Sequence, residues 1–129
     1  MQAIEQALTF YSIREWGKAE AVCRTILAAQ AAHFDALNLL GIITAQTQRP
    51  QEAVTYFGKA ASLKRNEPTV HNNYGNVLRD LGRHEEALRS YNRAIQLNPN
   101  YAEAHYNRGL TLHGAKRFED ALRSYDRDI

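Results

Sequence analysis

The chain has 129 residues and a formal net charge of +2, with 44% hydrophobic and 23% charged residues. This composition is typical of a folded soluble protein and not of a disordered one. The charge is too small, and the arginines are too scattered, to predict a nucleic-acid-binding surface. The single cysteine excludes an internal disulfide bond and fits a reducing compartment.

No stretch of the sequence predicts a membrane span or a secretion signal. The N-terminal segment carries Glu5 and Glu15 and alternates polar with apolar residues, unlike the apolar core of a signal peptide. The most apolar run, Leu37 to Ala45, is interrupted by Asn38 and is far shorter than the roughly 20 residues that cross a bilayer. We therefore expect a soluble, cytoplasmic protein with no membrane partner.

Residues 1–33 and 34–67 each predict two short amphipathic helices around a turn. The first turn falls at residues 15–17, and Cys23 lies on the apolar side of the helix that follows. Cys23 is therefore expected to be a small core residue and not a reactive thiol. The second turn falls at Arg49 and Pro50, where proline suits the first turn of a new helix.

Residues 68–101 begin at Pro68 and predict two helices around a turn at residues 81–83. Residues 102–129 repeat this pattern 34 positions later, and Glu119 and Asp120 are expected to begin the second helix of this copy. The identical pairs include His71/His105, Asn73/Asn107, Gly75/Gly109, Leu78/Leu112, Ala87/Ala121, Leu88/Leu122 and Tyr91/Tyr125. A fixed period of this length predicts a single all-α domain of stacked helical repeats: 1–33 (degenerate), 34–67, 68–101 and 102–129 (truncated).

Small residues recur where the two helices of each copy are expected to meet. Gly75 on the first helix and Ala87 on the second have counterparts in the second and fourth copies. Small side chains let the two backbones approach, so that larger neighbours interlock around them. One such hairpin cannot bury its apolar face alone, and neighbouring hairpins must stack.

This pattern resembles the tetratricopeptide repeat. The third copy carries it most completely, in His71, Tyr74, Gly75, Leu78, Ala87, Tyr91, Ala94 and Pro99. The first copy departs from it most, with Ala7 in place of the glycine, and the fourth has Asp128 where alanine is expected. The resemblance implies a right-handed superhelical solenoid of antiparallel helix pairs that binds a protein or peptide in its concave groove.

The resemblance also implies which residues line that groove, because the first helix of each repeat faces it. The implied positions are Asp35, Asn38, Leu39, Ile42, Ala45, Gln46, Thr69, Asn72, Asn73, Asn76, Arg79, Asp80, Glu103, Tyr106, Asn107, Leu110, His113 and Gly114. From these positions we take eight as the expected binding residues: Asn38, Asn72, Asn73, Asn76, Arg79, Tyr106, Asn107 and His113.

The asparagines give the groove its predicted chemistry. We expect Asn72, Asn73, Asn76 and Asn107 to lie away from the core, where an amide can both donate to and accept from a peptide backbone. The alternative is that they are ordinary solvated positions. Asn73 and Asn107 occupy the same groove position in adjacent copies, which resembles the asparagine ladder of O-linked N-acetylglucosamine transferases. The lysine of the family's carboxylate clamp is missing, since its positions hold Ile4, Asn38, Asn72 and Tyr106.

No catalytic or metal-binding motif occurs in the sequence. The five histidines lie at separate repeat positions, and no Gly-rich phosphate loop or nucleophile motif is present. We therefore expect a chain that is not an enzyme by itself and that needs no cofactor or metal. The leading hypothesis is a protein-binding groove. The alternatives are a substrate-recruiting arm of a longer glycosyltransferase-like enzyme, and self-association through an uncapped repeat end.

Overall fold

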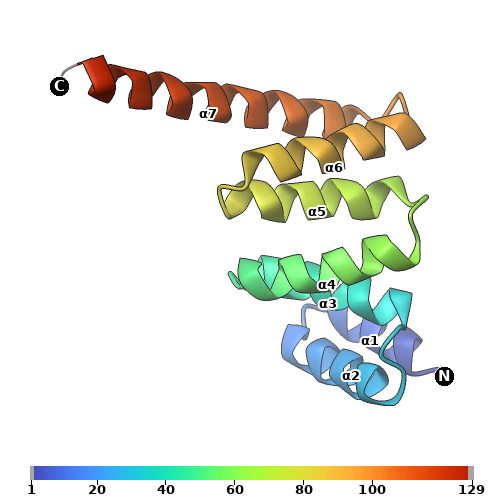
Figure 1. Ribbon diagram of the computed structural model, residues 1–129. Helices are drawn as coiled ribbons and strands as arrows, with labels where there is room; N and C mark the ends of the chain where they lie inside the picture. The colour runs from blue at the N-terminus through green and yellow to red at the C-terminus, as the bar shows by residue number, and fades with distance from the viewer. Residues whose placement is uncertain (1, 128–129) are drawn as a thin grey trace.

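The computed structural model describes the backbone of residues 2–127 and the side chains of residues 2–123, and it contains only α-helices within that range. They are α1 (Ala3–Ser12), α2 (Trp16–Ala29), α3 (Phe34–Gln46), α4 (Pro50–Leu63), α5 (Pro68–Asp80), α6 (His84–Leu97) and α7 (Ala102–Arg127). The first six form three antiparallel hairpins that stack on one another, with α7 across the end of the stack (Figure 1). The predicted all-α repeat solenoid is confirmed.

The hairpins are joined mainly where the second helix of one packs against the first helix of the next. Helix α1 contacts α3, α3 contacts α5 and α5 contacts α7, whereas the backbones of α2, α4 and α6 do not come close to one another in the described part of the chain. Each of these second helices instead contacts the first helix of the next hairpin. The first helices therefore form an inner row, and the second helices form an outer row with gaps between its members.

The same turn closes all three hairpins. Its left-handed residue is Arg14 (φ 63°), Gln48 (φ 63°) or Gly82 (φ 75°), and these positions are 34 residues apart. The next residue donates its backbone N–H to a carbonyl five positions earlier, at 2.8–2.9 Å. This bond satisfies a free carbonyl at the end of the inner helix, as in a Schellman motif. Only one of the three turns has glycine, the residue that adopts this conformation without steric cost.

The small residues of the sequence pattern accommodate aromatic rings. A Cβ atom placed on Gly75 would lie 2.7 Å from Cε1 of Tyr91, and one on Gly41 would lie 2.7 Å from Cε1 of Phe57. Both rings are buried, and Ala87 packs in the same cluster as Tyr91. In the first copy Cys23 takes the ring's position and is fully buried, which confirms it as a core residue. Burial raises the pKa of its thiol to about 11.

The fourth copy differs from our expectation. Glu119 and Asp120 do not begin a second helix, because α7 continues without a turn from Ala102 to Arg127. Lys116 stands where the other copies have their left-handed residue, and lysine is a good helix former. Phe118 and Leu122, which follow it, remain exposed. A turn at Lys116 would therefore gain no buried contacts to compensate for its strain.

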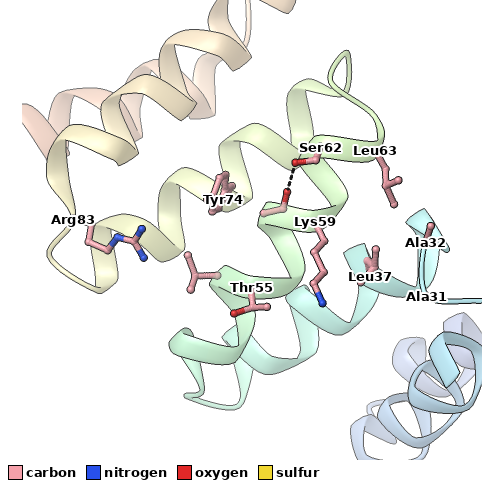
Figure 2. A pocket seen from close by; sticks show the side chains of 11 residues that line it. Ala31, Ala32, Leu37, Thr55, Lys59, Ser62, Leu63, Tyr74 and Arg83 are labelled. Atoms are coloured by element: carbon pink, nitrogen blue, oxygen red, sulfur yellow. Dashed lines mark hydrogen bonds between the residues drawn. The ribbon is translucent and has the colours of Figure 1, made fainter.

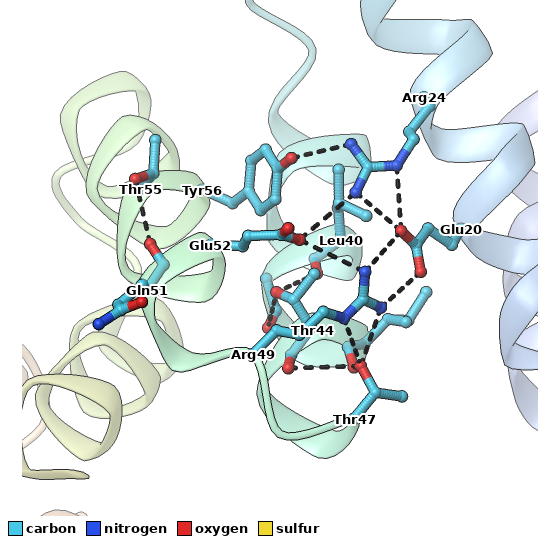
Figure 3. Close-up of polar contacts among 12 residues, drawn as sticks. Glu20, Arg24, Leu40, Thr44, Thr47, Arg49, Gln51, Glu52, Thr55 and Tyr56 are labelled. Atoms are coloured by element: carbon cyan, nitrogen blue, oxygen red, sulfur yellow. Dashed lines mark hydrogen bonds and ion pairs between the residues drawn. The ribbon is translucent and has the colours of Figure 1, made fainter. Parts of the chain in front are cut away.

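A charged cluster ties the first hairpin to the second (Figure 3). Glu20 on α2 accepts hydrogen bonds from Arg49 at 2.6 and 2.9 Å and from Arg24 at 2.7 and 3.0 Å. Arg24 also donates to the Tyr56 hydroxyl at 3.0 Å, and Glu52 pairs with both arginines. The Arg49 hydrogen bonds, followed by those of Arg24, lower the pKa of Glu20 to about 2. The cluster therefore links the outer helix of the first hairpin to the outer helix of the second.

Candidate peptide-binding groove

The inner row of helices presents a shallow hollow between α3 and α5. Its volume is about 200 Å³, and its lining consists of Ile42, Ala45, Gln46, Phe57, Asn73, Asn76, Val77 and Asp80. Six of these eight residues are groove positions implied by the resemblance, and only Phe57 and Val77 are not. The apolar side chains give the hollow a floor, while the amides and Asp80 supply hydrogen-bonding groups.

Two of the predicted groove asparagines are buried. Asn72 is 0% exposed and Asn107 is 8% exposed, so our expectation that they lie away from the core is wrong for this pair. Nδ2 of Asn107 donates to Oδ1 of Asn72 at 3.3 Å, which links α7 to α5. Buried amides need such a partner, because an unpaired polar group in the core is costly. The two asparagines therefore join adjacent repeats.

Asn73 and Asn76 do lie in the hollow. Oδ1 of Asn76 accepts a hydrogen bond from the Tyr91 hydroxyl at 2.7 Å, so this side chain is partly committed to the core. Asn73 is half-buried, and its amide forms no hydrogen bond with the described part of the chain. Although Asn73 and Asn107 share a repeat position, only Asn73 presents its amide to the hollow.

The remaining predicted residues do not line the hollow. Asn38 and Arg79 are half-buried, and each has one buried polar atom, Oδ1 and Nη1 respectively, with no partner among residues 2–123. Tyr106 is 68% exposed on α7, where His113 is also exposed. The structure thus brings Asn73 and Asn76 together, leaves Asn38 and Arg79 at the periphery, and places Tyr106 and His113 further along the inner row.

The outer face carries larger clefts that sequence reasoning missed. The largest, about 770 Å³, has its main wall along α4, with Leu37 at one end and Tyr74 and Arg83 at the other (Figure 2). Two more clefts, of about 440 and 310 Å³, lie between α4 and α6 and between α2 and α4. They lie between outer helices whose backbones are not in contact, an arrangement that depends on how the hairpins stack and not on the pattern of any one repeat.

The described residues show no arrangement suited to metal chemistry or to membrane insertion. No group of three or more His, Cys, Asp and Glu side chains in residues 2–123 is placed to hold a metal ion. Within residues 2–127, no helix combines the length and the apolar character needed to cross a bilayer.

The stacked hairpins and the inner groove define a helical-repeat protein of the tetratricopeptide type. Family models agree with this: the model described as "Tetratricopeptide repeat" matches residues 4–68, and the model described as "TPR repeat" matches residues 75–116. The chain belongs to the tetratricopeptide repeat family. A comparison with curated protein sequences found no match.

Solved structures share this fold. The crystal structure of MamA protein is 18% identical, with a TM-score of 0.84, over 96% of this chain and 68% of that one. The first repeat domain of Spaghetti (RPAP3), bound to an HSP90 peptide, is 17% identical, with a TM-score of 0.84, over 88% of this chain and 90% of that one. An O-GlcNAc transferase of Thermobaculum terrenum is 28% identical, with a TM-score of 0.78, over 86% of this chain but 21% of that one.

Proposed function

We propose that this chain is a protein-interaction module that binds an extended peptide or a partner helix along its inner row of helices. The observation that carries this proposal is the hollow between α3 and α5, where Asn73 offers an amide without a partner in the described residues beside the apolar side chains of Ile42 and Val77. Binding sites of this kind combine an apolar surface with a few polar groups that orient the ligand.

The chemistry of the hollow suits a peptide backbone. Each peptide residue brings one N–H donor and one C=O acceptor that need partners once they leave water. The Asn73 amide supplies both kinds of group, and Nδ2 of Asn76 remains able to donate while its Oδ1 accepts from Tyr91. Asp80 adds a negative charge to the lining, which favours a peptide with Lys or Arg at that point.

Tyr106 and His113 extend the proposed surface along α7. The exposed ring of Tyr106 can pack against an apolar side chain of the ligand, because an aromatic residue combines a large apolar area with a polar hydroxyl. Asn72 and Asn107 have a different role in this proposal. They hold α7 against α5, so replacing either one weakens the stack of repeats as well as any ligand contact.

A direct test selects peptides from a phage-displayed random library against the immobilised chain and measures their affinity by calorimetry. Asn73→Ala is expected to weaken binding about tenfold, the effect of losing one or two hydrogen bonds. Asn100→Ala, an exposed asparagine in the α6–α7 connection, is the matched control and should leave affinity unchanged. Far-UV circular dichroism should be the same for all three proteins. Equal affinity for the wild type and Asn73→Ala would show that the ligand binds elsewhere.

A second candidate function is a substrate-recruiting arm of a longer enzyme. The similarity to the O-GlcNAc transferase supports it, since the chain matches 21% of that protein at 28% identity. The reading frame that encodes this chain provides the test. A glycosyltransferase domain in the same frame supports the arm, and its absence leaves the free-standing interaction module.

A further inference from the structure

The second half of α7 leaves the stack of hairpins. Helix α7 continues well past the ends of α5 and α6, with its C-terminal part beside no other helix (Figure 1). Large apolar side chains on this part of the chain are exposed: Leu112 by 43%, Phe118 by 62% and Leu122 by 49%. The described part of the chain leaves about half of each of these side chains in solvent.

The same side chains are covered in the preceding repeat. Leu112 and Ala121 correspond to Leu78 and Ala87, which are 1% and 0% exposed and belong to one buried cluster between α5 and α6. The exposed segment therefore carries the apolar residues of an outer helix but makes none of an outer helix's contacts. The first half of α7 likewise carries the residues of an inner helix.

The inner half of α7 also has room for a partner. A Cβ atom on Gly75 would collide with the Tyr91 ring, whereas one on Gly109, the equivalent residue, would meet nothing within 4 Å. The space that an outer helix fills against α5 is thus open against α7. Both halves of a helix pair are present in the chain, but they are held end to end and cannot reach each other.

Lys116 explains why the two halves stay in line. It occupies the position of Gln48 and Gly82, the residues whose left-handed backbone closes the earlier hairpins. A non-glycine residue adopts that conformation at a steric cost, and lysine favours a continuing helix. A straight α7 avoids the turn but exposes the apolar surface that a closed hairpin would bury.

We propose that two copies of this chain associate by exchanging the second halves of α7. Residues 115–127 of each copy pack against residues 102–114 of the other, in the way that α6 packs against α5. In the preceding repeat Leu78 packs with Ala87. The equivalent contact in the dimer places Leu112 of one copy against Ala121 of the other. The two α7 helices then run antiparallel, and the two-fold axis passes near Lys116. This exchange buries the exposed face and requires no left-handed residue.

Positive and negative side chains are equal in number near the proposed two-fold axis. Lys116 and Arg117 are followed within one turn by Glu119 and Asp120, so the two copies bring equal numbers of positive and negative side chains to the crossing point. The two antiparallel interfaces are related by the two-fold axis, so the dimer is closed. This association does not depend on the peptide-binding role of the inner face, and the hollow between α3 and α5 lies away from α7.

The oligomeric state tests the proposal first. Light scattering coupled to size-exclusion chromatography should give twice the chain mass of 14.7 kDa. Lys116→Gly supplies the residue that the hairpin turn favours and weakens the straight helix. We expect it to raise the dimer dissociation constant at least about fivefold. Lys116→Ala keeps the straight helix and is the matched control. A wild-type monomer, or equal dissociation constants for the two variants, would overturn the proposal.

A disulfide test separates exchange from closure within one chain. In the double variant Leu112→Cys with Ala121→Cys, the two cysteines lie about 13.5 Å apart along a continuous helix, too far to bridge. An interchain disulfide after mild oxidation is the expected result. An intrachain disulfide shows that the hairpin closes on itself, and no disulfide shows that α7 stays unpaired; either overturns the exchange. Cys23 is fully buried, and the two single variants control for its reaction.

Discussion

The contact between Gly75 and the Tyr91 ring can be tested by adding a single methyl group. In Gly75→Ala the new Cβ atom would lie 2.7–2.9 Å from three ring atoms of Tyr91. The ring cannot easily move away, because it is fully buried and its hydroxyl donates to Asn76 at 2.7 Å. Gly58→Ala makes the same change in α4, where the nearest atom is the Tyr74 hydroxyl oxygen at 3.4 Å. It is the matched control.

The two variants should change stability in opposite directions. Overpacking a helix contact costs about 1–3 kcal/mol. Alanine in place of a mid-helix glycine recovers about 1 kcal/mol of helix propensity. For Gly75→Ala we expect an overpacking cost near the upper end of that range. After the gain in helix propensity is subtracted, the free energy of unfolding should fall by about 1–2 kcal/mol. For Gly58→Ala the propensity term dominates, and we expect a gain of about 0.5–1 kcal/mol.

Urea unfolding followed by far-UV circular dichroism measures both changes. Repeat arrays can unfold in parts, so the slopes of the transitions are compared before free energies are assigned. A double-mutant cycle with Tyr91→Leu isolates the contact: once the ring is removed, Gly75→Ala should no longer destabilise the protein. If Gly75→Ala stabilises the wild type as much as Gly58→Ala does, the packing argument fails.

Three further predictions concern the inter-repeat cluster, a turn and the cysteine. Glu20 has its pKa lowered from 4.5 to about 2, so its contribution is present above pH 4.5 and is lost as the pH falls towards 2. Partial solvent exposure of Arg49 reduces that contribution to about 1–2 kcal/mol; Glu20→Gln should lose this amount at pH 7 in urea titrations and much less near pH 2. Gln48→Gly, which copies Gly82, should raise stability by about 0.5–1 kcal/mol in the same titrations, and an unchanged midpoint would exclude strain at Gln48. The Cys23 thiol should react with a thiol reagent only at the rate at which the first hairpin opens, because the thiol is fully buried and its pKa is raised to about 11; immediate labelling of the native chain would contradict its burial.

The sequence predicts the helices well because the same residue pattern recurs in each copy. Gly75, Ala87 and Tyr91 have counterparts 34 positions away, so a weak local signal is supported by each copy in turn. Even the first copy, with Ala7 and Cys23, forms its hairpin with both residues fully buried. Periodicity therefore identifies helices and core positions from the sequence.

Other features depend on contacts that the sequence pattern of a single copy does not show. The fourth copy has most of the repeat pattern, but its turn at Lys116 depends on buried contacts that Phe118 and Leu122 do not make. Asn72 and Asn107 were predicted to be groove residues from their repeat positions, yet they are buried against each other across two repeats. The pattern of a single copy does not reveal this contact, because it joins residues that lie 35 positions apart in adjacent copies.

The gaps between the outer helices make the solenoid mechanically uneven. Helices α1, α3 and α5 touch in a continuous line, while α2, α4 and α6 are separated by clefts of about 310 and 440 Å³. Tension applied to the two ends would therefore pass between hairpins through the contacts of each outer helix with the next inner helix, and bending would open or narrow the outer clefts. The curvature of the stack would therefore change by movement of one hairpin against the next. A ligand held on the inner face would set that curvature.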